Sequence, residues 1–167
     1  LGAIAAAARR GARVIAVDLD PAKLAMARTL GATEGVLVGD DLVARLQALT
    51  GGDGPAVAIE AAGAPASFRN CVEAVAFAGR VACIGYAKSP VAYENKHVVQ
   101  KELDILGSRN AMPADFHAVV AMLSAGDFPL ATLVSRTVPF AEAAQALAAW
   151  DRDPVGTIKI LVEMAAG

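Results

Sequence analysis

The sequence predicts an α/β fold with a doubly wound parallel sheet, and three of its features support that class. Short apolar runs rich in Val and Ile alternate along the chain with Ala-rich segments of helical period. The helical segments are about 10–15 residues long, as expected for connections between parallel strands. An apolar content of 56% is sufficient for a large buried core. Together these features indicate a parallel sheet with helices on its faces.

The first 85 residues contain four predicted strands linked by helices. A helix over residues 1–10 is ended by Gly11 and leads into a buried strand over 13–18. Asp20 is the expected N-cap of the next helix, with Pro21 at its first position, and that helix continues to Gly31. The other predicted elements are strands over 35–38, 56–60 and 80–85, helices over 40–49 and 65–76, and a turn over 50–55.

The pattern changes after Gly85. A proline-containing loop is expected to run through His97 to the next strand. The predicted elements that follow are strands over 102–106, 133–138 and 157–162 and helices over 113–125 and 140–151. We therefore expect one domain over residues 1–107 and a C-terminal segment over residues 108–167 that packs on it.

Charge and composition argue against several kinds of partner. The formal net charge is −2 and no basic block is present, so neither nucleic acid nor an anionic membrane is expected. No apolar run reaches the roughly 18–20 residues of a membrane span, and no signal peptide is visible. Cys71 and Cys83 lack CxxC spacing. We expect them to be buried free thiols in a reducing cytoplasm rather than a disulfide or a metal site.

The run from Val14 to Asp20 is the most informative stretch of the chain. Its apolar strand ends in Asp18, and an acid at that position of a βαβ unit can accept hydrogen bonds from both hydroxyls of an adenosine ribose. The same charge repels a 2′-phosphate, which favours NAD over NADP. Because Asp20 caps the following helix, Asp18 remains available for a ligand. S-adenosylmethionine enzymes use a similar acid, so the cofactor stays open here. Lys23 could reach the ribose or adenine, or be a solvated helix lysine.

Two further strand ends carry glycine. One predicted strand ends in the segment from Glu60 to Gly63, and the next ends in Ile84, Gly85 and Tyr86. Ligands of open α/β sheets bind beyond the carboxyl ends of the strands, where small residues let the backbone approach. Gly63 and Gly85 fit this pattern, although either could be a turn glycine.

Five segments together resemble the medium-chain dehydrogenase/reductase superfamily, in particular its zinc-type alcohol, polyol and sugar-acid dehydrogenases. They are VIAVDLDPAKLAMARTLGA, AIEAAGAP, GRVACIGYAK, KELDILGSRNA and TIKILV. The resemblance covers essentially the whole chain. It implies a Rossmann-type NAD-binding domain that is truncated at its N-terminus, because the chain begins just after the third glycine of the phosphate loop. The C-terminal segment would return to an N-terminal catalytic domain.

The resemblance also implies roles for individual residues. Asp18 would hold the adenosine ribose with help from Lys23, and Lys159 would lie near the pyrophosphate. Residues that would line the cofactor groove and the nicotinamide end are Ala62, Gly63, Ile84, Gly85 and Tyr86. Ser108, Arg109 and Asn110 would lie near the substrate, a small alcohol or a sugar-derived molecule.

The chemistry implied by the resemblance is NAD-dependent oxidation of a secondary alcohol, with zinc bound by the N-terminal domain. His97 and His117 are not expected to replace its ligands, since a catalytic zinc needs about three converging protein ligands. The chain alone is expected to be inactive. The parent enzyme is expected to be a homodimer or homotetramer. The alternatives are a zinc-free quinone-type reductase, disfavoured by Asp18, and a non-catalytic or methyltransferase-like nucleotide-binding module.

The sheet itself is expected to be incomplete. In the usual strand order 3-2-1-4-5-6, the first strand lies between the strands predicted over 13–18 and 56–60. Without it, both would expose unpaired backbone groups, each costing roughly 1–3 kcal/mol if buried. The missing strand could be encoded upstream, the two strands could pair directly, or a second chain could complete the sheet. We favour the first.

Overall fold

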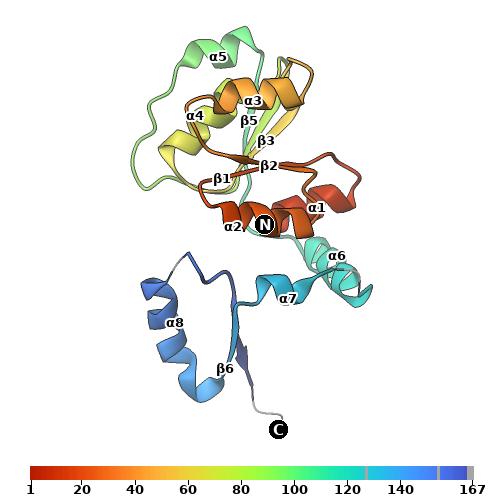
Figure 1. The fold of residues 1–167 in the computed structure, drawn as a ribbon, viewed down its shortest axis with the longest axis vertical. Coiled ribbons are helices and arrows are strands. Elements are labelled where there is room, and N and C mark those ends of the chain that lie inside the picture. Colours follow the sequence, from red (N-terminus) through yellow and green to blue (C-terminus); the bar gives the residue numbers. More distant parts are fainter. Residues whose placement is uncertain (127, 154, 165–167) are drawn as a thin grey trace. The chain divides into compact units, whose positions relative to one another are not determined.

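A computed structural model describes residues 1–126, 128–153 and 155–164. The chain divides into two compact units, residues 1–111 and residues 112 onward. Helices alternate with strands through both, and every strand pair is parallel (Figure 1). The predicted α/β class with parallel strands is therefore confirmed.

The first unit contains five strands and five helices among its described residues, nearly all where the sequence predicts them. The strands are β1 (Ile15–Asp18), β2 (Glu34–Leu37), β3 (Val57–Glu60), β4 (Arg80–Cys83) and β5 (Asp104–Gly107). The helices are α1 (Gly2–Arg9), α2 (Pro21–Thr29), α3 (Leu42–Leu49), α4 (Pro65–Ala74) and α5 (Asn95–Gln100). The Asp20 carboxylate accepts a hydrogen bond from the Ala22 amide at 2.8 Å, which confirms the predicted N-cap of α2.

The strands of this unit form two separate sheets. One contains β1 and β2, and the other has the order β3-β4-β5. Among the described residues β1 and β3 do not pair with one another, so direct pairing of these two strands is not found. Each keeps one edge without a strand partner, and Val57 and Ile59 of β3 are 51% and 43% exposed. Apolar side chains this exposed are unusual in a parallel sheet, which is normally covered on both faces.

Three clusters of buried side chains hold the unit together. Ala16, Leu24 and Ala27 pack α2 against β1. A second cluster joins the two sheets, because Val36 of β2 and Leu46 of α3 pack in it with Ala74 of α4. The third lies around β4 and consists of Val72, Val75 and Val81. Contact between α3 and α4 thus fixes the first sheet relative to the second without a strand between them.

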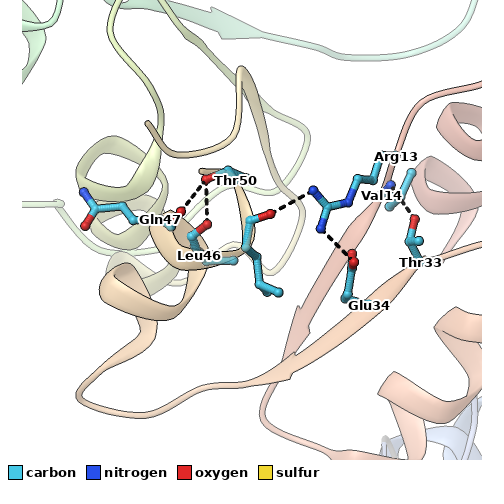
Figure 2. A network of polar contacts seen from close by, with 8 residues as sticks. Arg13, Val14, Thr33, Glu34, Leu46, Gln47 and Thr50 are labelled. Atoms are coloured by element: carbon cyan, nitrogen blue, oxygen red, sulfur yellow. Dashed lines mark hydrogen bonds and ion pairs between the residues drawn. The ribbon is translucent and has the colours of Figure 1, made fainter. Parts of the chain in front are cut away.

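Arg13 links the start of the first sheet to the end of α3 (Figure 2). Its guanidinium donates to the Leu49 carbonyl and to Glu34 Oε1, each at 2.8 Å. The Leu49 carbonyl belongs to the last turn of α3, which lacks helical amide partners for its carbonyls. Thr50 caps the same end through its hydroxyl, which donates to Leu46 at 2.7 Å.

Two short helices were not predicted. The segment over 95–100, expected to be a loop through His97, is the helix α5, and Val98 from it packs on the third cluster. Residues 130–133 form α7 (Leu130–Leu133), whereas the predicted strand was to begin near residue 133. Helices this short contain too few residues for a periodic apolar pattern, so local sequence does not reveal them.

The second unit contains a parallel strand pair with a helical connection. β6 (Arg136–Pro139) pairs with β7 (Ile160–Glu163), and η1 (Phe140–Glu142) and α8 (Ala143–Arg152) lie between them in sequence. α6 (Pro113–Ser124) opens the unit, and Asp115 of its first turn accepts a hydrogen bond from the Met112 amide at 2.8 Å. His117 lies on this helix, as predicted.

Candidate functional site

At the end of β1, the Asp18 carboxylate has one oxygen that already accepts a hydrogen bond from the backbone. Asp18 Oδ1 accepts a hydrogen bond from the Asp20 amide at 3.0 Å, which orients the exposed side chain. Oδ2 makes no hydrogen bond among the described residues, so it can accept one from a ligand. The Asp18 carbonyl accepts from the Val38 amide at 3.0 Å, which fixes the strand end against the segment after β2. Lys23 lies in the first turn of α2 and is half-buried.

The ends of β3 and β4 lie in very close backbone contact. Gly63 has a φ of +68°, and a Cβ there would lie 2.8 Å from the Tyr86 carbonyl oxygen. A Cβ on Gly85 would lie 2.4 Å from the Gly63 nitrogen. Both distances are far below an ordinary contact, so neither position accepts a larger residue without moving the other loop. The structure thus brings together all five residues predicted after β3 and β4: Ala62, Gly63, Ile84, Gly85 and Tyr86.

Gly63 and Gly85 allow the loop after β3 and the loop after β4 to touch one another directly. The sequence suggested that their small size would let a ligand approach the backbone, whereas the atoms nearest to each are those of the opposite loop. Ile84 is 50% exposed and Tyr86 is 83% exposed beside this contact. The paired loops therefore offer an exposed backbone and side-chain surface with a fixed internal geometry.

Glu60 is the residue at this edge to which the sequence analysis assigned no role. It lies at the last position of β3 and is 3% exposed. Its Oε1 accepts hydrogen bonds from the Ala62 and Gly63 amides at 3.0 and 2.9 Å, and from the Ser67 hydroxyl. The signal was present, because Glu60 is an acid at the end of an apolar strand, as Asp18 is.

Both cysteines are free thiols close to Glu60. Burial raises the pKa of the Cys71 thiol to about 12, and the Glu60 charge and the Cys83 thiol add to the rise. Burial and Glu60 also raise the pKa of Cys83. Since the thiolate is the reactive form, neither residue has the environment of a nucleophile.

The predicted substrate residues follow β5. Ser108, Arg109 and Asn110 are exposed, and the Ser108 amide donates to the Cys83 carbonyl at 2.8 Å. Asn110 has a φ of +63°, a conformation that asparagine tolerates better than most residues. Lys159 belongs to the second unit, where it is exposed and precedes β7. Its role near a pyrophosphate stays a prediction.

The described part of the chain does not fit a catalytic zinc. No group of three His, Cys, Asp or Glu side chains within it could hold a metal ion. His97 and His117 lie on different helices, α5 and α6, of different units.

Among the residues that the structure describes, no helix is both long enough and apolar enough to span a membrane.

An open hollow of about 410 Å³ runs beside β2, lined by residues of that strand and of α2 and α3. Arg28, Glu34 and Arg45 are its charged lining residues. None of the predicted site residues lines it. The candidate site is therefore the exposed strand ends rather than this hollow.

Comparison with known proteins identifies similar sequences and folds. Residues 1–125 match the family model described as zinc-binding dehydrogenase. L-galactonate-5-dehydrogenase of Escherichia coli K12 is 29% identical over 164 residues, which cover 96% of this chain and 47% of that protein. The chain thus spans about half the length of the curated relatives it matches.

Two solved structures illustrate the fold likeness. The 2R,3R-butanediol dehydrogenase of Bacillus subtilis has a TM-score of 0.84 at 26% identity, covering 96% of this chain and 46% of that one. A protein of Escherichia coli CFT073, described as a short chain alcohol dehydrogenase complexed with the cofactor NADH, has a TM-score of 0.78 at 25% identity. That match covers 90% of this chain and 44% of the other.

Proposed function

This chain belongs to the zinc-binding dehydrogenase family, within the medium-chain dehydrogenase/reductase superfamily, and on that premise we propose that it binds NAD for an alcohol dehydrogenase. The enzyme would transfer a hydride from a secondary alcohol of a polyol or sugar acid. The chain supplies the cofactor-binding surface and part of the substrate wall. Its substrate class rests on relatives named for L-galactonate and 2R,3R-butanediol.

The observation that carries the proposal is the state of Asp18. One carboxylate oxygen is held by the Asp20 amide, while the other makes no hydrogen bond among the described residues at the exposed end of β1. Such an acid suits the hydroxyls of an adenosine ribose and repels the 2′-phosphate of NADP. Lys23, one turn into α2, assists at the same ribose.

The loops in contact at the ends of β3 and β4 would bind the nicotinamide half of the dinucleotide. A Rossmann-type sheet consists of two mononucleotide-binding halves, and its ligand lies outside the carboxyl ends of the strands. β1 and β2 belong to the first half and β3 to β5 to the second. The segments Ala62–Gly63 and Ile84–Tyr86 then face the nicotinamide end. When bound, NAD accepts the hydride there.

The unpaired edges of β1 and β3 support a further strand between them. Each edge lacks a strand partner among the described residues, and α3 and α4 already hold the two sheets in one unit. A parallel strand there would bring a glycine-rich phosphate loop to the carboxyl ends. In the family resemblance that underlies the proposal, the zinc ligands would belong to a separate catalytic domain.

The remaining assignments follow the family and extend the proposal. Residues 1–107 are the cofactor domain and residues 108–167 a C-terminal segment, with Ser108, Arg109 and Asn110 on the substrate side. The enzyme is a cytoplasmic homodimer or homotetramer. No alcohol oxidation is expected from this chain by itself, and turnover without an added domain would contradict the assignment.

The test is a titration of the ¹⁵N-labelled chain with NADH, NADPH and S-adenosylmethionine, followed by amide chemical shifts. NADH is expected to shift the amides around Asp18 at lower concentration than NADPH. Asp18→Asn should reduce that preference, because it removes the charge that repels the 2′-phosphate. Asp53→Asn removes an equal charge from an exposed turn and serves as the matched control. Binding of S-adenosylmethionine without NADH would overturn the proposal.

A further inference from the structure

Glu60 is nearly inaccessible to solvent, yet its side chain organises the backbone of an exposed surface. Among the described residues it is the one charged side chain with an exposure as low as 3%. A carboxylate is retained in such a place only when hydrogen bonds replace its hydration. We propose that Glu60 is a positioning residue, which sets the two loops that bind the nicotinamide half of the dinucleotide. This inference rests on the proposed function and deepens it.

The Glu60 side chain fixes the first of these loops, Ala61–Ala64. One oxygen, Oε1, receives the consecutive amides of Ala62 and Gly63 at 3.0 and 2.9 Å and also the Ser67 hydroxyl. Two adjacent amides directed at one oxygen require a sharp turn, and Gly63 adopts it with a φ of +68°. Hydrogen bonds to a charged acceptor are stronger than those between neutral groups. The loop therefore depends on one atom of one side chain.

The main chain of Glu60 fixes the second loop, Ile84–Tyr86. Its carbonyl oxygen accepts hydrogen bonds from the Ile84 and Gly85 amides at 2.8 and 3.0 Å. A Cβ on Gly85 would lie 2.8 Å from Glu60 Oε2 as well as 2.4 Å from the Gly63 nitrogen. Glu60 is thus in contact with both loops at the point where they meet.

Loss of the side chain would release the first loop from the second. The Ala62 and Gly63 amides would lose their acceptor, and removal of a buried partner costs more than an average hydrogen bond. Because Gly63 packs directly on Gly85 and Tyr86, a change in its conformation moves the whole surface formed by the two loops. Asp18 lies in the other sheet and makes no hydrogen bond to this group. The adenosine half should therefore be unaffected.

The experiment compares binding of NADH with binding of AMP, which carries only the adenosine half. In Glu60→Ala, the dissociation constant for NADH should rise at least about tenfold, and that for AMP should change less than about twofold. Glu60→Gln keeps a carbonyl oxygen for the same amides and should restore NADH binding to within about threefold. Hydrogen exchange at Gly63 should be fast in the alanine variant and slow in the glutamine variant.

Two controls separate the possible outcomes. Asp18→Ala should weaken both ligands, because both contain the adenosine ribose. Gly85→Ala separates the same loops from the other side, and it should weaken NADH selectively even if Glu60→Ala does not fold. If the unaltered chain binds neither ligand, the proposed function fails and this inference with it. If it binds both but Glu60→Ala and Gly85→Ala weaken them equally or not at all, only the positioning role is refuted.

Discussion

Lys101 stabilises the C-terminal end of α4, and its replacement gives a sharp test of the folded structure. Its ammonium group donates to the carbonyls of Glu73 at 2.7 Å, Val75 at 3.0 Å and Val72 at 3.4 Å. The last carbonyls of a helix have no amide partners within it, so a cation at this end both bonds to them and favours the helix dipole. Lys101→Met keeps most of the aliphatic chain and removes these donors.

The expected loss can be worked out from these contacts. The two shorter hydrogen bonds involve a charged donor, for which about 1.5–3 kcal/mol each is typical before other costs. Burial lowers the pKa of Lys101, against the attraction of Glu73, so desolvation offsets part of that gain. Water can also reach the carbonyls in part, since Lys101 is only half-buried. We expect Lys101→Met to lower the free energy of unfolding by about 2 kcal/mol.

Thermal unfolding followed by circular dichroism measures this loss. For a chain of this size, 2 kcal/mol corresponds to a fall in Tm of roughly 4–8 °C. Lys96→Met is the matched control, because Lys96 pairs with Glu94 at the exposed start of α5 and with no other acid among the described residues. An ion pair this exposed is screened by solvent and contributes little to stability. A Lys101→Met variant as stable as Lys96→Met would show that the three carbonyl contacts do not stabilise the helix end.

Three further predictions concern stability. For Cys71, the pKa in the folded state is about 12 against 9.0 for an exposed thiol, so its stabilising contribution is complete below pH 9 and decreases as pH rises toward 12. The free energy of unfolding, measured by urea titration, should therefore fall between pH 8 and pH 10 by about 1 kcal/mol more in the unaltered protein than in Cys71→Ala. Ala78 has a φ of +53°, so Ala78→Gly should raise the free energy of unfolding by about 0.5 kcal/mol in urea titrations. Arg13→Met should lower it by about 1 kcal/mol, since the Leu49 carbonyl and Glu34 lose their shared donor.

Each of these three stability predictions would be contradicted by a specific result. Equal pH dependence in the protein with and without Cys71 would mean that the thiol titrates normally. A destabilised Ala78→Gly variant, similar to the Ala66→Gly control within α4, would mean that the left-handed conformation carries no strain. An Arg13→Met variant with unchanged stability would mean that the network in Figure 2 does not hold α3.

Much of the fold could be predicted from local sequence because each major element has its own signal. The apolar strand before Asp18 and the Asp20 cap specify β1 and the start of α2 through interactions within a few residues. The helix α5 could not be predicted in this way. It is short, and its place is set by the packing of Val98 on a cluster formed by α4 and β4.

The sequence by itself determined the class of fold and the strand-end acid Asp18, because periodicity, caps and terminal acids are local properties. The family was indicated by the resemblance of five segments rather than by any of these local properties. The sequence also predicted that the strands over 13–18 and 56–60 would each keep an edge without a strand partner. Only the tertiary structure decided how the two sheets of the first unit are joined, which is through α3 and α4. It also decided the role of the glycines and of Glu60. Gly63 and Gly85 are about twenty residues apart in sequence, and their mutual contact exists only because β3 and β4 pair in parallel.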